Sequence, residues 1–159
     1  MAITPNTTFT SGAVLTADQM NRLPWGIMGT ATTSAVDQTG ITGVTDVTGA
    51  SITFTAVANR YYIALGFAVV AASAGSPALQ QFLVTNSAAS TTYAIEIGHF
   101  TAGGGNVVTA DCQSTPFTLS AGSNTLKLRF GRSGGDAATY TVSNSTRPAS
   151  IAVFDIGQA

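Results

Sequence analysis

Charge is the scarcest property of this sequence. Its 159 residues include six Lys and Arg and seven Asp and Glu, with a single lysine, Lys127, and a single glutamate, Glu96. Soluble domains usually carry about 25% charged residues, which keep surfaces soluble and strand edges unpaired. Ser and Thr fill about a quarter of this chain instead. The surface of a protein with so little charge must either be covered with hydroxyl groups and glycine or be buried against further copies of the protein. The composition therefore predicts a component of an assembly.

Histidine, cysteine and basic clusters are also scarce, and each scarcity excludes a class of site. His99 is the only histidine, so one subunit cannot build a metal site on two imidazoles, although a ring of His99 around a threefold axis stays open. Cys112 has no cysteine partner and shares a strand face with Val108 and Ala110, which predicts a buried small side chain. The few arginines are scattered and the net charge is −1, so we expect no nucleic-acid partner.

Groups that could perform catalysis are few. A Ser or Cys nucleophile would need His99 as its base, and no Gly-x-Ser-x-Gly elbow accompanies any serine. No spacing brings two carboxylates together, so a hydrolase of the host envelope, which would use Glu96 or Asp111, stays only as an alternative. We expect no enzymatic activity, no metal and no cofactor.

Long apolar runs are absent as well. The longest run, Tyr61 to Ala72, is short and is interrupted by Gly66, and the amino terminus lacks a basic region followed by an apolar one. We therefore expect neither a membrane span nor a signal peptide. If the protein acts outside a cell, we expect it to leave by lysis or inside a particle and not by the general secretory route.

The segment before residue 27 carries a helix start signal. Thr16 and Gln19 form a capping box and Pro24 ends the helix, which predicts about two turns from Ala17 to Leu23, behind an extended arm. A helix this short is marginal alone, so its apolar side chains must dock on the domain's own base, on a neighbouring subunit or on a larger partner. The candidate particle-docking residues are Leu15, Met20, Leu23 and Trp25.

From Ile27 onward the pattern becomes that of β-strands. Residues 51–56 and 125–130 alternate apolar with polar side chains, which predicts half-buried antiparallel strands with one dry and one wet face. About eight to ten such strands, separated by turns rich in glycine, predict an all-β, jelly-roll-like antiparallel β-sandwich. The expected domains are an arm with one short helix in residues 1–26 and a single sandwich in residues 27–159.

Two of the expected strands are apolar on both faces. Tyr61 to Val70 and Ala149 to Ile156 belong either in the centre of a sheet or against another subunit. Together with the low charge, they predict self-association, with a homotrimer favoured and dimers or larger rings left open. The candidate interface residues are Tyr61, Ile63, Leu65, Phe67 and Val69.

Two arginines stand beside dense apolar sequence. We expect the guanidinium groups of Arg60 and Arg129 to meet Asp46 or Asp155 within the chain, with pairing between subunits as the alternative.

Three runs of the sequence carry a resemblance to a known family. Residues 9–26 follow the pattern F-x-x-G-x-x-L-x-A-x-x-x-N-x-L-P-x-G, and residues 51–62 and 120–129 read SITFTAVANRYY and SAGSNTLKLR. They resemble small β-rich virion structural proteins of tailed bacteriophages, of the minor tail, fibre or head-decoration type. The resemblance implies a β-rich domain behind a docking arm and brings no catalytic residues.

Composition and resemblance favour one hypothesis: a non-enzymatic virion protein on the particle surface, a tail-tip or fibre component anchored by its N-terminal arm to other virion proteins. We then expect assembly into the virion in the host cytoplasm and release by lysis. A capsid decoration (cement) or head-fibre protein is the first alternative. The second is a carbohydrate-binding module that holds a host surface glycan with the loops at 75–78, 86–91 and 99–106. Its candidate glycan contacts are Phe100 and Tyr140, aromatic residues that flank loops.

Overall fold

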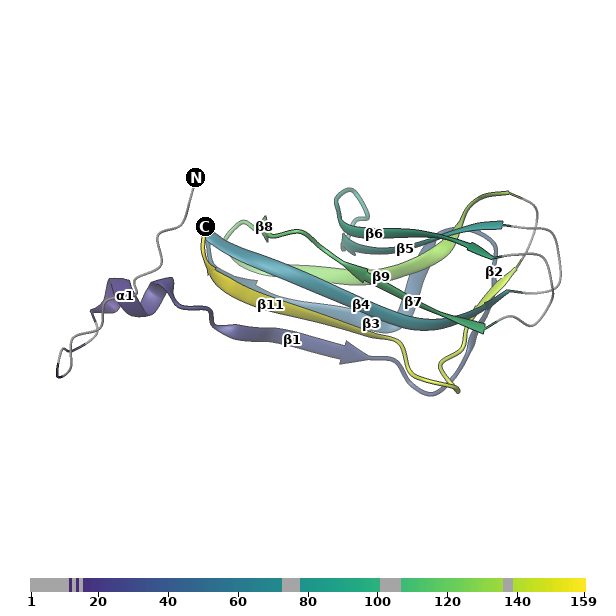
Figure 1. Ribbon diagram of the computed structural model, residues 1–159, viewed down its shortest axis with the longest axis horizontal. Coiled ribbons are helices and arrows are strands. Elements are labelled where there is room, and N and C mark those ends of the chain that lie inside the picture. The colour runs from purple at the N-terminus through teal and green to yellow at the C-terminus, as the bar shows by residue number, and fades with distance from the viewer. Residues whose placement is uncertain (1–11, 13, 15, 73–77, 101–106, 136–138) are drawn as a thin grey trace.

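A short helix precedes two β-sheets in this computed structural model, which describes residues 12, 14, 16–72, 78–100, 107–135 and 139–159 (Figure 1). The helix is α1 (Ala17–Arg22). The strands are β1 (Gly26–Thr32), β2 (Gln38–Ile41), β3 (Thr45–Ala56), β4 (Arg60–Ala72), β5 (Ala78–Asn86), β6 (Thr92–Phe100), β7 (Val107–Gln113), β8 (Phe117–Thr118), β9 (Gly122–Gly135), β10 (Tyr140–Val142) and β11 (Ser150–Gln158). Apart from α1, the described part of the chain is built from strands, as the alternating pattern predicted.

The strands form two antiparallel sheets. Sheet A runs β1, β11, β4, β10, β2, with β7 and β8 also paired to β4, and sheet B runs β3, β9, β5, β6. Because β11 and β7 both pair with residues 65–67 of β4, they lie on opposite sides of it. β10 pairs with residues 70–72 of β4 and so continues the side of β11.

The order of the eight long strands defines a jelly roll. Numbered along the chain from one to eight, β1, β3, β4, β5, β6, β7, β9 and β11 are ordered 1-8-3-6 in sheet A and 2-7-4-5 in sheet B. Each sheet thus places strands from the start of the chain beside strands from its end, as a folded antiparallel ribbon does. The structure confirms the predicted sandwich and adds the topology, which the number of strands does not fix.

The hydrophobic core lies between the inner faces of the two sheets. Phe82 and Phe130 of sheet B and Tyr140 of sheet A are among its largest side chains, and the rings of Phe130 and Tyr140 meet edge to face with their centroids 5.4 Å apart. Tyr140 is 0% exposed, so the prediction that it contacts a glycan is wrong: β10 holds it between β4 and β2 with its ring in the core. Phe100 ends β6, and its side chain lies outside the described residues.

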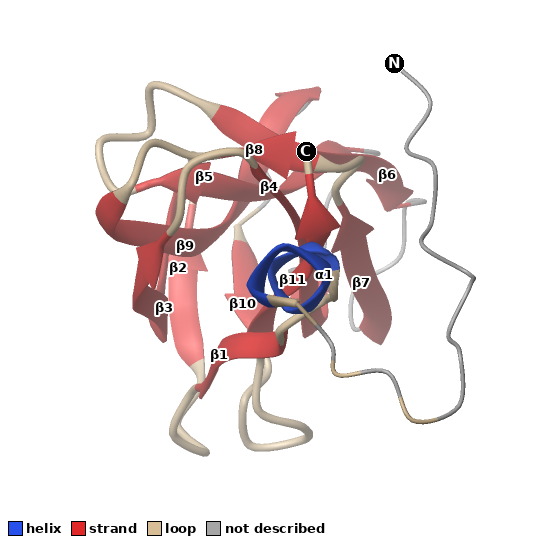
Figure 2. Ribbon diagram, turned by 90° about the vertical axis from the view of Figure 1, so that its left-hand side faces the viewer, coloured by secondary structure: helices blue, strands red, loops and turns tan. Residues whose placement is uncertain are grey.

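The helix lies beyond one end of the sandwich, at which β1 begins and β3 ends (Figures 1 and 2). The amide of Met20 donates to the carbonyl of Thr16 at 3.0 Å, and that of Leu23 donates to the carbonyl of Met20 at 3.2 Å. The helix therefore ends one residue before the predicted Leu23, at Arg22. Leu15, a predicted docking residue, lies outside the described residues.

Candidate docking site

The end of the sandwich that carries α1 exposes several large apolar side chains. Met20 is 49% exposed, Leu23 42% and Trp25 49%, and Val57, in the turn between β3 and β4, is 37% exposed. We call these four residues the docking end. Trp25 and Val57 line the same shallow depression, so the helical segment and the β3–β4 turn form one surface.

A buried ion pair fastens the helical segment to the sandwich. The carboxylate of Asp155 on β11 accepts two hydrogen bonds from the guanidinium of Arg60 at the start of β4, one of them 2.6 Å long. It also accepts bonds from the amides of Trp25 at 3.3 Å and Gly157 at 3.0 Å. Both side chains of the ion pair are buried, so each charge depends on the other for compensation. The structure confirms the predicted pairing of Arg60 within the chain.

The same arginine holds the chain where it leaves α1. Its Nη2 donates to the carbonyl of Leu23 at 2.7 Å, and its Cζ lies 4.2 Å from the centroid of the Trp25 ring. One face of the indole is thus covered by a cation, which is a favourable contact for an aromatic ring. Arg60 therefore fixes the backbone at Leu23 and the ring of Trp25 together, while both side chains remain half exposed.

The depression beside Trp25 has a volume of about 270 Å³ and is open to solvent. Its wall includes the turn around Asn59, which adopts a left-handed backbone with φ of 60°. The hydroxyl of Tyr62 accepts from the amide of Val57 at 2.8 Å and donates to its carbonyl at 3.2 Å. The turn is therefore held in place by a buried tyrosine, and the docking end has a defined shape.

The predicted interface residues of β4 lie on the outer face of sheet A. Tyr61, Ile63 and Phe67 are partly exposed there and Leu65 is 36% exposed. Val69 is only 6% exposed and so is already buried within the chain, which makes the prediction that it contacts a neighbouring subunit wrong.

Neighbouring segments alter this face in two ways. The guanidinium of Arg147 covers the ring of Phe67 at 4.3 Å. The face also extends across the sheet from β4 to β11 and β1. Ile63 of β4 pairs with Phe154 of β11, which in turn pairs with Ile27 of β1. Sequence reasoning placed the β11 segment at an interface but did not include Ile27, since only the strand register brings it there.

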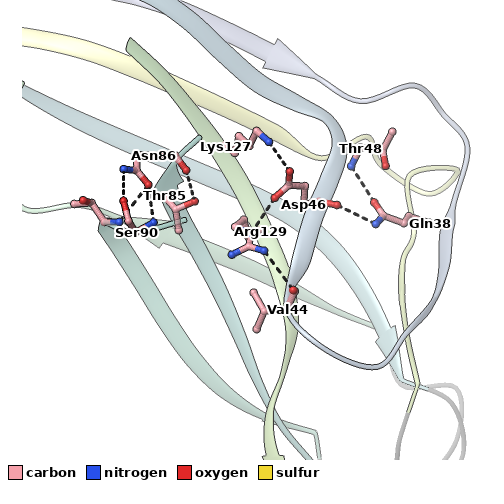
Figure 3. A network of polar contacts seen from close by, with 10 residues as sticks. Gln38, Val44, Asp46, Thr48, Thr85, Asn86, Ser90, Lys127 and Arg129 are labelled. Atoms are coloured by element: carbon pink, nitrogen blue, oxygen red, sulfur yellow. Dashed lines mark hydrogen bonds and ion pairs between the residues drawn. The ribbon is translucent and has the colours of Figure 1, made fainter. Parts of the chain in front are cut away.

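The outer face of sheet B is charged and polar on β3 and β9 (Figure 3), whereas its edge strand β6 exposes two isoleucines. Asp46 accepts hydrogen bonds from Lys127 at 2.6 Å and from Arg129 at 2.9 Å, which confirms the predicted pairing of Arg129. The hydrogen bond from Lys127, followed by the charges of both basic residues, holds the pKa of Asp46 below its ordinary value of 3.8. Thr53 and Thr125 share a hydrogen bond of 2.7 Å across β3 and β9. The β3 and β9 part of this face is suited to contact with water.

The side chains considered for catalysis are spread over the structure, are buried or are engaged in hydrogen bonds. Glu96 accepts a hydrogen bond from the backbone amide of Asp111 at 3.2 Å, so it joins the edges of the two sheets. Cys112 is buried, and burial, followed by the charge of Glu96, raises the pKa of its thiol to about 12. Among the described residues, no three His, Cys, Asp or Glu side chains gather as a metal site would require, and no helix is long and apolar enough to span a membrane. The side chain of His99 lies outside the described residues.

Known proteins offer a distant likeness. No protein-family model and no curated protein matches this chain. The chain is similar to a mutant VP2 protein of infectious bursal disease virus in derived T=1 particles, with 15% identity and a TM-score of 0.45, covering 98% of this chain and 42% of that one. It is also similar to the VP2 subviral particle of the same virus, with 15% identity and a TM-score of 0.42, covering 86% and 38%. The chain spans about two fifths of these proteins, and a likeness this distant carries no argument about function.

The geometry of the docking end suits binding rather than chemistry. Its side chains are apolar and half exposed, and the one ion pair beneath them is buried and fully used by backbone and indole contacts. An apolar surface of fixed shape gains free energy by leaving water, at about 25 cal/mol for each Å² of apolar area buried. The arrangement can therefore seat the protein on a partner with a complementary apolar surface.

Proposed function

We propose that this protein is a non-enzymatic structural component of a bacteriophage virion, displayed on the particle surface and anchored through its docking end. Within the virion we favour a tail-tip or fibre component, with a capsid decoration or head-fibre protein as the alternative. The proposal is supported by the low charge of the chain, by its jelly-roll fold and by the resemblance of residues 9–26 to virion proteins of tailed phages.

The observation that carries the proposal is the combination of exposure and rigidity at the docking end. Met20, Leu23 and Trp25 expose about half of their surface, although burying such side chains is normally favourable. The backbone that carries them is nevertheless held by the buried pair of Arg60 and Asp155. Holding apolar side chains in solvent in one fixed arrangement is typical of a surface prepared for a partner.

The test is incorporation into particles by a variant with an altered docking end. In the double variant Met20→Ser and Leu23→Ser the backbone bond from Arg60 to Leu23 and the buried ion pair remain, so the fold should persist. Because apolar anchors dominate the binding energy of interfaces, we expect the number of copies per purified particle to fall by about tenfold or more. Quantitative mass spectrometry of purified particles measures this number.

The matched control is the double variant Ile95→Ser and Ile97→Ser. These side chains lie on β6, are 52% and 59% exposed, and undergo a comparable loss of apolar surface. We expect normal incorporation of the control. Equal incorporation of both variants, with circular dichroism showing both folded, would contradict anchoring through the docking end.

A further inference from the structure

The outer face of sheet A carries no charged side chain on three adjacent strands. The alternation of each strand and the pairing between strands identify the outward positions. They are Ile27, Thr30 and Thr32 of β1, Ser150, Ala152, Phe154 and Ile156 of β11, and Tyr61, Ile63, Leu65 and Phe67 of β4. By contrast, the outer face of sheet B carries the charged cluster of Asp46, Lys127 and Arg129 on β3 and β9, while its edge strand β6 exposes Ile95 and Ile97. The outer face of sheet A is thus uncharged across three adjacent strands, whereas charge interrupts the outer face of sheet B.

The apolar positions of sheet A form continuous rows across the strands. Ile27, Phe154 and Ile63 are register partners on β1, β11 and β4, and the next row places Ala152 beside Leu65. Side chains of paired residues on one face of a sheet lie about 5 Å apart and contact each other. These five residues therefore make one apolar patch, which we call the outer apolar face. Its most exposed member, Ile27, is 64% exposed.

Charge borders this patch at one end. Asp111 of β7 is the register partner of Phe67, and the guanidinium of Arg147 lies over the Phe67 ring. Both charges lie beside Phe67, on the side of the patch that faces away from the docking end. The remainder of the face is neutral, so a partner that presented charges to it would leave those charges desolvated and unpaired.

We propose that the outer apolar face is the contact with a second copy of this chain. The same face of a second copy is neutral and apolar, so it buries no unpaired charge, and two sheet faces pack well at about 10 Å. This contact leaves Met20 and Leu23 free, so it goes beyond the proposed anchoring and can fail independently of it.

The size of the face agrees with such a contact. Three strands at about 4.8 Å spacing and a β11 of nine residues at about 3.3 Å per residue give a footprint of about 430 Å². A standard interface buries about 800 Å² of accessible surface on each partner, and accessible surface exceeds a flat footprint because side chains roughen it. The contact is thus at the lower end of the standard size, and we expect reversible association that depends on concentration.

The test is the mass of the purified full chain in solution as a function of concentration, measured by light scattering and sedimentation. We expect assemblies of the 16.1 kDa chain that dissociate on dilution. A mass of two chains that the variants below dissociate supports the proposal. A mass of three contradicts it, because two identical faces that pack on each other close at two copies. A protein that stays monomeric at the highest concentration overturns the proposal.

Two lysine variants locate the contact. Leu65→Lys places a charge in the centre of the outer apolar face, and Ile27→Lys places one on the exposed edge strand, where the fold tolerates it even if Leu65→Lys does not fold. Because each would bury an unpaired charge, we expect the concentration for half-association to rise by about tenfold or more. The control Ile97→Lys makes the same change at a side chain with 59% exposure on sheet B. Equal effects of Ile27→Lys and Ile97→Lys would overturn the proposal.

Discussion

Removal of the Asp155 carboxylate should be the most damaging single change at the docking end. The carboxylate is buried and accepts four hydrogen bonds, two from Arg60 and one each from the amides of Trp25 and Gly157. Asp155→Ala leaves the Arg60 guanidinium, which is 4% exposed, without its counter-charge. Breaking a buried pair by removing one partner costs about 3–5 kcal/mol.

The assay is urea unfolding of the wild type and the variants, followed by circular dichroism and by the fluorescence of Trp25, the only tryptophan. Asp155→Asn should cost less than Asp155→Ala, because its amide oxygen can still accept from the two backbone amides. The control is Asp46→Ala, which breaks an ion pair whose carboxylate is 46% exposed and should cost about 0.2–1 kcal/mol. If Asp155→Ala costs no more than Asp46→Ala, the ion pair does not fasten the helical segment as described.

Three further predictions concern single residues. The pKa of Asp46 is lowered chiefly by the hydrogen bond from Lys127, so the ionised carboxylate stabilises the fold fully above about pH 4, and this stabilisation is lost as the pH falls through the lowered pKa. At pH 7 the wild type should be more stable than Asp46→Asn by about 0.2–1 kcal/mol. Acid unfolding titrations and high salt should both remove this difference. A Cβ on Gly131 would lie 2.2 Å from a backbone oxygen of the β2–β3 connection, so Gly131→Ala should lower the free energy of unfolding in urea by about 1–3 kcal/mol. Gly134→Ala, whose new Cβ would have its nearest atom at 3.5 Å, should match the wild type. Equal losses in the two variants would contradict the close approach at Gly131. Burial raises the pKa of Cys112 to about 12, so a disulfide reagent at pH 8 should label the folded protein far more slowly than the urea-unfolded one, and rapid labelling of the folded protein would contradict this burial.

The sequence was sufficient for the local features that depend on neighbouring residues. Alternation over residues 51–56 and 125–130 predicted β3 and β9, and Pro24 with the capping signal at Thr16 predicted a helix that differs from α1 by one residue. The pairing of Arg60 with Asp155 and of Arg129 with Asp46 was also predictable, because a chain with so few acids offers few partners for an arginine beside apolar sequence.

Features that depend on strand register could not be predicted from the sequence. Tyr140 was expected at the surface because it flanks a loop, yet pairing of the short strand β10 with β4 and β2 buries it completely. Ile27 was not included in the interface because it is distant in sequence from Ile63, and only the order β1, β11, β4 aligns them. The sequence pattern assigns faces within a strand, whereas the strand order decides which faces meet.

The central claim is that this protein belongs to a virion and is anchored there by its N-terminal end. The most direct measurement is electron microscopy of intact phage particles labelled with an antibody against residues 27–159, the part expected to face outward. The account predicts label on the particles, at the tail end for a tail-tip or fibre component and over the head for a decoration protein. Particles that contain no label at either place, from a host culture in which the protein is expressed, would contradict the account.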